Sequence, residues 1–271
     1  MLTEEELQVM QKRLTGQVAG QQLHIYESVG STNDVLREKM AEGAPNGTAV
    51  IAFTQTAGRG RKGRRFQSLK GKGLYFSLLL RPDCPTEELA TITPRAAVAV
   101  CEALEWAADV RPAIKWPNDI VCDGRKLCGI LTEAMPDPVS GRLCVIVGIG
   151  LNLYQTDEDF GPELAPLAVS LASVSPRVLP KENTLLEILL RCLDPLAAEF
   201  PAGHSRALES YRSHCLNPGR EVSVIRSDGS VQTAVCLQVN DDFTLQLQYP
   251  DGQTEAVSSG EVSVRGLYGY V

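Results

Sequence analysis

The sequence contains no hydrophobic run long enough to cross a membrane. Its longest uncharged apolar stretch, residues 143–154, falls well short of the roughly 20 residues that a transmembrane helix requires. The N-terminus, MLTEEELQVMQKRL, is acidic from its fourth residue and lacks the apolar core of a secretory signal. Hydrophobic residues make up 44% and charged residues 22% of the 271 residues. This composition argues against disorder, collagen and coiled coil for the chain as a whole.

Cysteine pairs of the CxxC type are also missing. The eight cysteines are scattered singly along the chain, at positions 84, 101, 122, 128, 144, 192, 215 and 236. In a chain of this length, scattered cysteines are typical of reduced thiols in the cytoplasm rather than of disulfides or a zinc site. We therefore predict a soluble cytoplasmic protein that has no metal ligands of its own and no contact with a membrane.

Acidic residues are absent from one long segment, although they dominate elsewhere. The net charge is −7, which argues against bulk binding to nucleic acid. Residues 43–82 nevertheless hold eight Lys and Arg and no Asp or Glu, so the rest of the chain has 18 basic residues against 33 acidic ones. Such a concentration predicts one local anion site. The alternative is a basic loop that is merely solvated.

The hydrophobic periodicity predicts two domains. The larger, residues 1–216, begins with a short N-terminal helix within residues 1–20, opened by a capping-box pattern at Thr3. The second, residues 217–271, has five short alternating runs separated by turn signals, which indicate a small β-barrel or sandwich. In the larger domain we expect strands at residues 23–26, 48–54, 73–80, 113–116, 120–122, 127–134 and 143–151, and helices at 31–43, 93–109, 185–200 and 205–214.

A loop rich in glycine and arginine is the first candidate site. It reads TQTAGRGRKGRRF over residues 54–66, and the connection around it spans about seventeen residues. Glycines let backbone amides approach an anion, and guanidinium groups suit phosphate and carboxylate oxygens. The loop matches neither a Walker A motif nor the dinucleotide fingerprint. Its like charges should repel one another, so we expect it to be mobile when empty and to order around an anionic ligand. Taken alone, it indicates nucleic-acid contact or a solvated loop as readily as catalysis.

Two further constellations accompany this loop. KWPND at residues 115–119 precedes GRKLCGILTE at 124–133, around a tight hairpin whose strands are otherwise apolar. Lys126 enters an apolar strand there, so its ammonium can point inward at a ligand; the alternative is a turn with solvated charges. The other constellation is Ser31-Thr32-Asn33 at a helix start, where simple N-capping is an equally good reading.

Taken together, these motifs resemble the biotin–protein ligases (biotin–[acetyl-CoA-carboxylase] ligases). The resemblance rests on GSTN at residues 30–33, QTAGRGRKGR at 55–64, GLYFSLLLRP at 73–82, KWPNDIVCDGRKLCGIL at 115–131 and VIVGIGLNL at 145–153. It implies an α+β fold. A central mixed β-sheet with helices, related to class II aminoacyl-tRNA synthetases, would be followed by a small C-terminal SH3-like β-barrel. Only about 22 residues precede the matching core, so the chain resembles the short form that lacks a DNA-binding domain.

The resemblance also implies an activity. Biotin would be activated by ATP to biotinyl-5′-AMP and then transferred to a lysine of a carrier protein, with Mg²⁺ neutralising the departing pyrophosphate. It implies Lys126 and Arg59 as catalytic residues. Biotin or its adenylate would be bound by Ser31, Thr32, Asn33, Gln55, Arg59, Gly60, Arg61 and Lys126. The nucleotide would be bound by Arg61, Arg64, Phe66, Asn118 and Asn152. Phe66 stands where the family often has Trp, and either ring can stack on adenine.

Other functions remain open from the sequence. A lipoate–protein ligase or octanoyltransferase shares the implied fold, but the GRGRKGR and KWPND strings favour biotin. A nucleic-acid-binding module acting through the arginine loop is disfavoured by the acidic remainder of the chain. A degenerate binder without catalysis is disfavoured by the presence of Lys126 and Arg59. The implied partner is a biotin carboxyl carrier protein or biotin-dependent carboxylase. A homodimer is compatible with the sequence, and DNA is not an expected partner.

Overall fold

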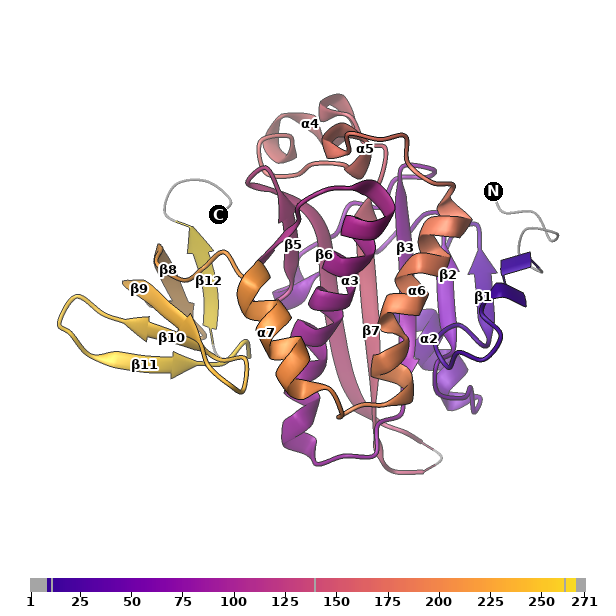
Figure 1. Ribbon diagram of the computed structural model, residues 1–271, viewed down its shortest axis with the longest axis horizontal. Coiled ribbons are helices and arrows are strands. Elements are labelled where there is room, and N and C mark those ends of the chain that lie inside the picture. Colours follow the sequence, from indigo (N-terminus) through magenta and orange to yellow (C-terminus); the bar gives the residue numbers. More distant parts are fainter. Residues whose placement is uncertain (1–8, 11, 139, 261, 267–271) are drawn as a thin grey trace.

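A seven-stranded mixed sheet forms the centre of the protein (Figure 1). The computed structural model describes residues 9–10, 12–138, 140–260 and 262–266. The sheet contains β1 (Leu23–Tyr26), β2 (Ala49–Ala52), β3 (Gly73–Leu80), β4 (Ala113–Lys115), β5 (Asp119–Cys122), β6 (Arg125–Pro136) and β7 (Leu143–Asn152). Their order is β1-β2-β3-β7-β6-β5-β4, with only β1 and β2 parallel. The predicted central mixed sheet is confirmed.

Helices cover both faces of this sheet. On one face lie α3 (Ile92–Ala108), α6 (Glu182–Ala198) and α7 (His204–His214); on the other lies α2 (Thr32–Ala41) (Figure 1). Successive residues of a strand point to opposite faces, so Leu78 and Leu80 of β3 pack in the core under α3 and α6. Leu79 packs against Leu36 and Met40 of α2 instead. Burial on both faces explains why β3 is almost continuously apolar.

A second, five-stranded antiparallel sheet follows, as expected for the SH3-like C-terminal unit. It contains β8 (Glu221–Arg226), β9 (Val231–Val239), β10 (Leu245–Gln248), β11 (Thr254–Val257) and β12 (Val262–Gly266), in the order β11-β10-β9-β8-β12. Trp116 joins it to the first sheet, because its indole N–H donates to the Phe243 carbonyl at 2.9 Å. The Tyr211 ring of α7 also meets the Phe243 ring edge-on, with centroids 5.4 Å apart.

The structure contains helical segments that the sequence analysis missed. These are α4 (Asp157–Leu164), α5 (Leu171–Val174) and the 3₁₀ turns η1 (Arg61–Gly63) and η2 (Thr86–Thr91). Gly161 and Pro162 interrupt α4, which hides its periodicity, and α5 is a single turn. The predicted N-terminal helix falls largely on residues 1–8 and 11, outside the described residues. In the described part of the chain, no helix is long and apolar enough to span a bilayer.

Candidate functional site

A cavity of about 630 Å³ lies where the first sheet, the arginine loop and the start of α2 meet. Eleven of the twelve predicted site residues line it: Ser31, Thr32, Asn33, Gln55, Arg59, Gly60, Arg61, Arg64, Phe66, Asn118 and Lys126. Ile130, Leu131 and Ile149 supply apolar walls, and Val264 of β12 reaches the cavity from the second sheet. The chain therefore brings the three constellations, from three separate segments, to one place.

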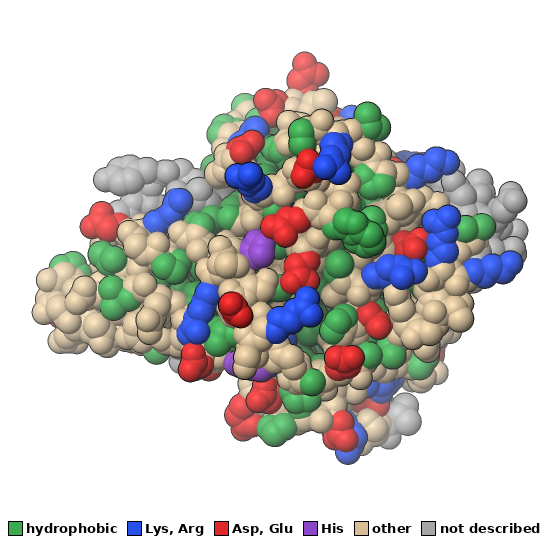
Figure 2. All heavy atoms as spheres, in the orientation of Figure 1, with side chains coloured by type: hydrophobic (Ala, Val, Ile, Leu, Met, Phe, Trp, Pro, Cys, Tyr) green, Lys and Arg blue, Asp and Glu red, His purple; other side chains and the backbone are tan. Residues whose placement is uncertain are grey.

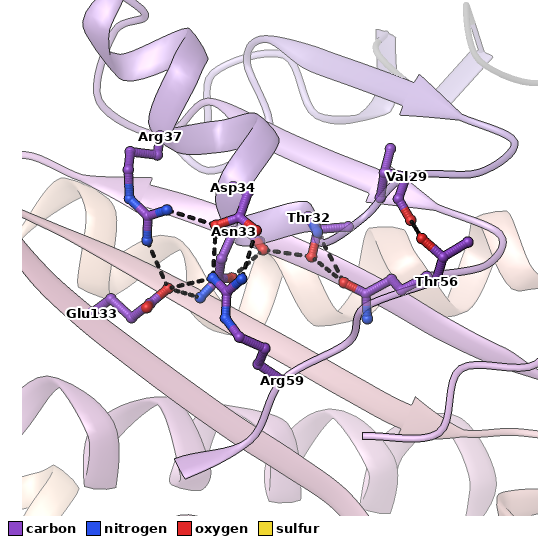
Figure 3. A network of polar contacts seen from close by, with 10 residues as sticks. Val29, Thr32, Asn33, Asp34, Arg37, Thr56, Arg59 and Glu133 are labelled. Carbon is purple, nitrogen blue, oxygen red and sulfur yellow. Dashed lines mark hydrogen bonds and ion pairs between the residues drawn. The ribbon is translucent and has the colours of Figure 1, made fainter. Parts of the chain in front are cut away.

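The start of α2 forms a buried polar end of the cavity (Figure 3). The backbone N–H of Thr32 donates to Gln55 Oε1 at 2.9 Å, and Asn33 Nδ2 donates to Glu133 Oε2 at 2.7 Å. Ser77 Oγ, fully buried on β3, lies 2.7 Å from Thr32 Oγ1. Ser31 is the N-cap residue, but its side chain makes no capping hydrogen bond. The capping interpretation of this motif is therefore wrong for the Ser31 hydroxyl.

Two glycines of β7 keep the floor of the cavity free of side chains. A Cβ on Gly148 would come 2.3 Å from Asn33 Oδ1, and one on Gly150 would come 2.6 Å from the Phe66 ring. Residues i and i+2 of a strand share a face, so the spacing of these glycines was a usable signal. The sequence analysis used this strand only as part of the family resemblance and did not single out either glycine.

Lys126 is held at the cavity by its main chain as well as by its side chain. Its N–H donates to the Leu167 carbonyl at 2.8 Å, and its carbonyl accepts from the Val169 N–H at 2.9 Å. Its ammonium lies 2.5 Å from Asp119 Oδ1 and 5.9 Å from the centroid of the Phe66 ring. The ammonium thus faces the cavity, as predicted. Asp119 and the buried Lys115 also line the cavity; both belong to the KWPND string, but the sequence analysis assigned neither a role.

The two leading arginines of the loop point in different directions. Arg61 reaches across the cavity: it donates to Asn118 Oδ1 at 3.1 Å and to the carbonyl of Ser259. Burial lowers the pKa of Arg61, although an arginine remains charged at neutral pH. Arg59 instead forms two hydrogen bonds with Asp34 of α2, at 2.6 and 2.7 Å. Arg59 lowers the pKa of Asp34, mainly through these hydrogen bonds.

Carboxylates from outside the loop offset much of its positive charge. Besides the Arg59 pair, Lys70 bonds to Glu27, and Lys72 bonds to Asp159 at 2.8 Å. The loop also closes on itself, because Phe66 N–H donates to the Gly58 carbonyl at 2.9 Å. The expectation of a simply self-repelling loop is therefore wrong for these cations. The loop itself has no acidic residue, but the fold brings carboxylates from other segments next to its cations.

Three further exposed cations lie at the tip of this loop. They are Lys62, Arg64 and Arg65, and all three line the cavity. Their exposure leaves them able to meet an anionic group that enters from solvent.

Asn152 lies behind the cavity wall and is absent from its lining. It is 5% exposed, and its Nδ2 donates to the carbonyls of Lys126 at 3.3 Å and Val169 at 3.2 Å. Its Oδ1 accepts from Gln155 Nε2 at 3.2 Å. In this structure Asn152 therefore ties β6 to the segment that follows α4.

The part of the chain that the structure describes holds no group of three or more His, Cys, Asp or Glu side chains able to bind a metal. Asp119 and Asn118 both line the cavity, and each side chain carries an oxygen that can bind a cation. Mg²⁺ takes one or two protein oxygens together with phosphate and water, so this pair fits an ion delivered with a nucleotide.

Comparison with known proteins gives a consistent picture. The Biotin/lipoate A/B protein ligase family matches residues 25–152. The chain is 35% identical over 240 residues to the bifunctional ligase/repressor BirA of Bacillus subtilis, covering 88% of this chain and 73% of that protein. It is 32% identical over 259 residues to the biotin–[acetyl-CoA-carboxylase] ligase of Mycobacterium tuberculosis, covering 93% of each. The biotin protein ligase of Aquifex aeolicus, solved with biotin and ATP, superposes with a TM-score of 0.75 at 29% identity. That match covers 90% of this chain and 99% of the other.

Proposed function

This chain belongs to the biotin/lipoate A/B protein ligase family, and we propose from that premise that its cavity joins biotin to a carrier protein. The enzyme is an ATP-dependent ligase: it forms biotinyl-5′-AMP and transfers the biotinyl group to a lysine of a biotin carboxyl carrier protein. One observation carries the proposal. A donor-and-acceptor end, formed by the buried Thr32 and the half-buried Gln55, lines the same apolar-walled cavity as the cations Arg61 and Lys126.

The first step joins two anions. A carboxylate oxygen of biotin attacks the α-phosphorus of ATP, a new P–O bond forms, and the bond to pyrophosphate breaks. The carboxylate and the phosphate repel each other, so cations fixed at the point of attack lower the barrier. Lys126 serves this role, because its main chain is anchored on both sides and its ammonium faces the cavity. Arg61, held by Asn118, is the second cation.

The second step forms the amide. The lysine amine of the carrier attacks the carbonyl carbon of the adenylate, the C–O bond to AMP breaks, and the amine gives up a proton. The mixed anhydride must be kept from water until then. The loop tip at Lys62 and Arg64 lies over the outer cavity and can contribute to that shielding once an anion neutralises it.

Biotin and the nucleotide occupy opposite ends of the cavity in this proposal. The ureido ring of biotin lies at Ser31, Thr32, Asn33 and Gln55. Its thioether-bearing ring and valeryl chain lie between Ile130 and Ile149. The nucleotide lies toward Arg64, Phe66 and Asn118. Asn152 contributes by holding the strand of Lys126 rather than through the cavity surface. Gly60 gives the loop backbone close access to the ligand, and Arg59 acts through Asp34 rather than at the reacting atoms.

Mg²⁺ enters with ATP in this proposal. Asp119 and Asn118 would hold it together with phosphate oxygens, and the ion would supply neutralisation of the departing pyrophosphate. The Asp119 carboxylate also pairs with Lys126, so it orients this ammonium whether or not the ion is bound.

We further propose that the chain acts in the cytoplasm, divides near Leu216 into catalytic and C-terminal units, can form a homodimer and does not bind DNA. The net charge of −7 supports the last point. On the face formed by α3, α6 and α7, acidic and basic side chains are intermixed (Figure 2). Sequence-specific DNA binding in the presence of biotin and ATP would overturn this part of the proposal.

Mass spectrometry of the reaction products tests the proposal. Purified protein with biotin, ATP and Mg²⁺ should yield biotinyl-5′-AMP, and a biotin carboxyl carrier protein should then gain the mass of one biotinyl group. Lipoate in place of biotin is the control. Adenylation of lipoate and not of biotin would refute the substrate assignment.

A further inference from the structure

A chain of hydrogen bonds connects an unassigned carboxylate to the polar end of the cavity (Figure 3). Glu133 of β6 accepts from Asn33 Nδ2, with 2.7 Å between nitrogen and Oε2. On the other side of this amide, Asn33 Oδ1 lies 2.6 Å from Ser77 Oγ, which in turn lies 2.7 Å from Thr32 Oγ1. Asn33, Ser77 and Thr32 are all buried, so this chain of hydrogen bonds runs through the protein interior to the cavity wall.

The carboxylate fixes the direction of every bond in this chain. An ionised glutamate accepts and cannot donate, so the Asn33 amide must present nitrogen to Glu133 and oxygen to Ser77. The amide oxygen also only accepts, so the single Ser77 proton is directed at it. The short contact between Ser77 and Thr32 then requires the Thr32 hydroxyl to donate to Ser77 Oγ. The free lone pairs of Thr32 Oγ1 are left as an acceptor.

Gln55 is oriented by a separate constraint. The backbone N–H of Thr32 can only donate, so it selects the oxygen end of the Gln55 amide, at 2.9 Å. Gln55 Nε2 therefore lies on the other side, where it donates one hydrogen to Ser68 Oγ at 3.1 Å and retains a second. Thr32 Oγ1 also lies 3.2 Å from Gln55 Oε1, but its single proton is already directed at Ser77 Oγ, so it still presents a lone pair to the cavity. An acceptor on Thr32 thus stands beside a donor on Gln55.

Two guanidinium groups lie beside the Glu133 carboxylate, where this chain of hydrogen bonds begins. Arg37 approaches Glu133 Oε2 at 3.3 Å and Arg59 at 3.8 Å. These cations pair with the Glu133 carboxylate, which is only partly exposed. Arg59 and Arg37 are themselves held by Asp34, so the cluster is internally paired. Its charge is therefore not available for the ligand.

We infer that Glu133 is a positioning residue that sets the donor and acceptor pattern read by the polar end of the cavity. The pattern, an acceptor beside a donor, complements the N–H and C=O of a cyclic urea and gives no match to a dithiolane ring. The inference rests on the proposed function, since it takes biotin as the ligand. It adds a residue that never touches biotin and acts through Asn33, Ser77 and Thr32.

Replacing Glu133 with glutamine removes the directional constraint and keeps the size of the side chain. A glutamine can offer either an oxygen or an N–H to Asn33, so the Asn33 amide can turn over and the Ser77 proton can move to Thr32. In that arrangement Thr32 has its own proton free to point at the ligand, and an N–H of the urea meets a donor. Binding of biotin should weaken, whereas ATP, which contacts none of these residues, should bind as before.

Isothermal titration calorimetry on the full chain tests this. Glu133→Gln should raise the Kd of biotin about tenfold, the loss expected for one buried hydrogen bond turned from matched to mismatched. The KM of ATP, and kcat at saturating biotin, should stay within about threefold. Arg37→Gln is the matched control, because it removes a neighbouring charge without touching the Asn33 amide, and its biotin Kd should change less than about threefold.

A second measurement separates orientation from general damage. Biotin methylated at either ureido nitrogen cannot donate from that nitrogen. In the parent protein, methylation at the position facing Thr32 should weaken binding strongly; in Glu133→Gln this loss should shrink severalfold. Ser77→Ala breaks the same chain, so its effect and that of Glu133→Gln on biotin Kd should be far from additive.

The outcomes are distinct from failure of the proposed function. Absence of biotinyl-5′-AMP from the parent protein would refute the proposed substrate. Adenylate formation by the parent together with an unchanged biotin Kd in Glu133→Gln would refute the positioning role alone. Additive effects of Glu133→Gln and Ser77→Ala would refute it as well, as would an unchanged penalty for methylation.

Discussion

Replacement of Lys126 by methionine removes one charge from the centre of the proposed reaction and little else. The backbone of Lys126 is anchored by hydrogen bonds to Leu167 and Val169 that do not involve the side chain. Methionine keeps the unbranched apolar stem, which packs beside Gly129. The ammonium lost is the one that lies 2.5 Å from Asp119 Oδ1.

The expected loss of rate follows from the geometry. An ammonium fixed at an attacking carboxylate and phosphate should contribute about 2–4 kcal/mol to transition-state stabilisation, the order of magnitude for one preorganised donor at developing charge. At about 1.4 kcal/mol for each factor of ten, adenylation should slow roughly 30- to 1,000-fold. The Asp119 carboxylate loses the Lys126 ammonium in the variant and so adds negative charge beside the incoming anions, which places the expected loss of rate toward the upper end of this range.

The assay is rapid-quench measurement of biotinyl-5′-AMP at saturating biotin and ATP. Arg125→Met is the matched control: it is the neighbouring residue on β6, and its side chain pairs at 3.6 Å with the exposed Asp157. That variant should keep the parent rate within about twofold. Both variants should unfold near the parent temperature. An adenylation rate for Lys126→Met within a few-fold of the parent would refute the assigned role.

Three further predictions concern the surroundings of the cavity. In Gly150→Ala the new Cβ would lie 2.6 Å from the Phe66 ring. The ring should shift, raising the KM of ATP about tenfold or more, while the Kd of biotin stays nearly constant. Equal changes in these two constants would contradict the placement of ATP and biotin at opposite ends of the cavity. Limited trypsin digestion should cut the free protein first at the exposed Lys62, Arg64 and Arg65, and biotin with ATP and Mg²⁺ should slow these cuts. Equal rates with and without ligand would show that the loop tip does not close. Arg59 lowers the pKa of Asp34, so their ion pair stabilises the fold fully above the ordinary carboxyl pKa of about 4 and less as pH falls through the lowered pKa. Urea unfolding should give Asp34→Asn a deficit of up to about 1 kcal/mol at pH 7, shrinking in acid; a deficit that grows in acid would contradict this sign.

Much of the framework follows from the sequence by itself. The strand at residues 73–80 was predicted with the bounds that β3 has, because a continuous apolar run that begins at a glycine is a signal visible in the local sequence. The run is continuous because β3 is buried on both faces. The five short C-terminal strands were likewise visible as alternation between turns. The resemblance of the GSTN, TQTAGRGRKGRRF, KWPND and GRKL strings to those of biotin–protein ligases was sufficient to name eleven residues that line the cavity.

Only the tertiary structure decided how these residues divide the work. Arg59 lines the cavity, and Asp34 of α2 holds it there at 2.6 Å; this ion pair was not predicted, since a carboxylate distant in sequence can lie next to Arg59 in space. Asn152 was expected at the nucleotide, but its amide is used by the Lys126 and Val169 carbonyls. Glu133 was not singled out, because its partner Asn33 is 100 residues away. A motif fixes which side chains are present, whereas the direction of a buried hydrogen bond depends on which groups the fold brings within 3 Å or so of one another.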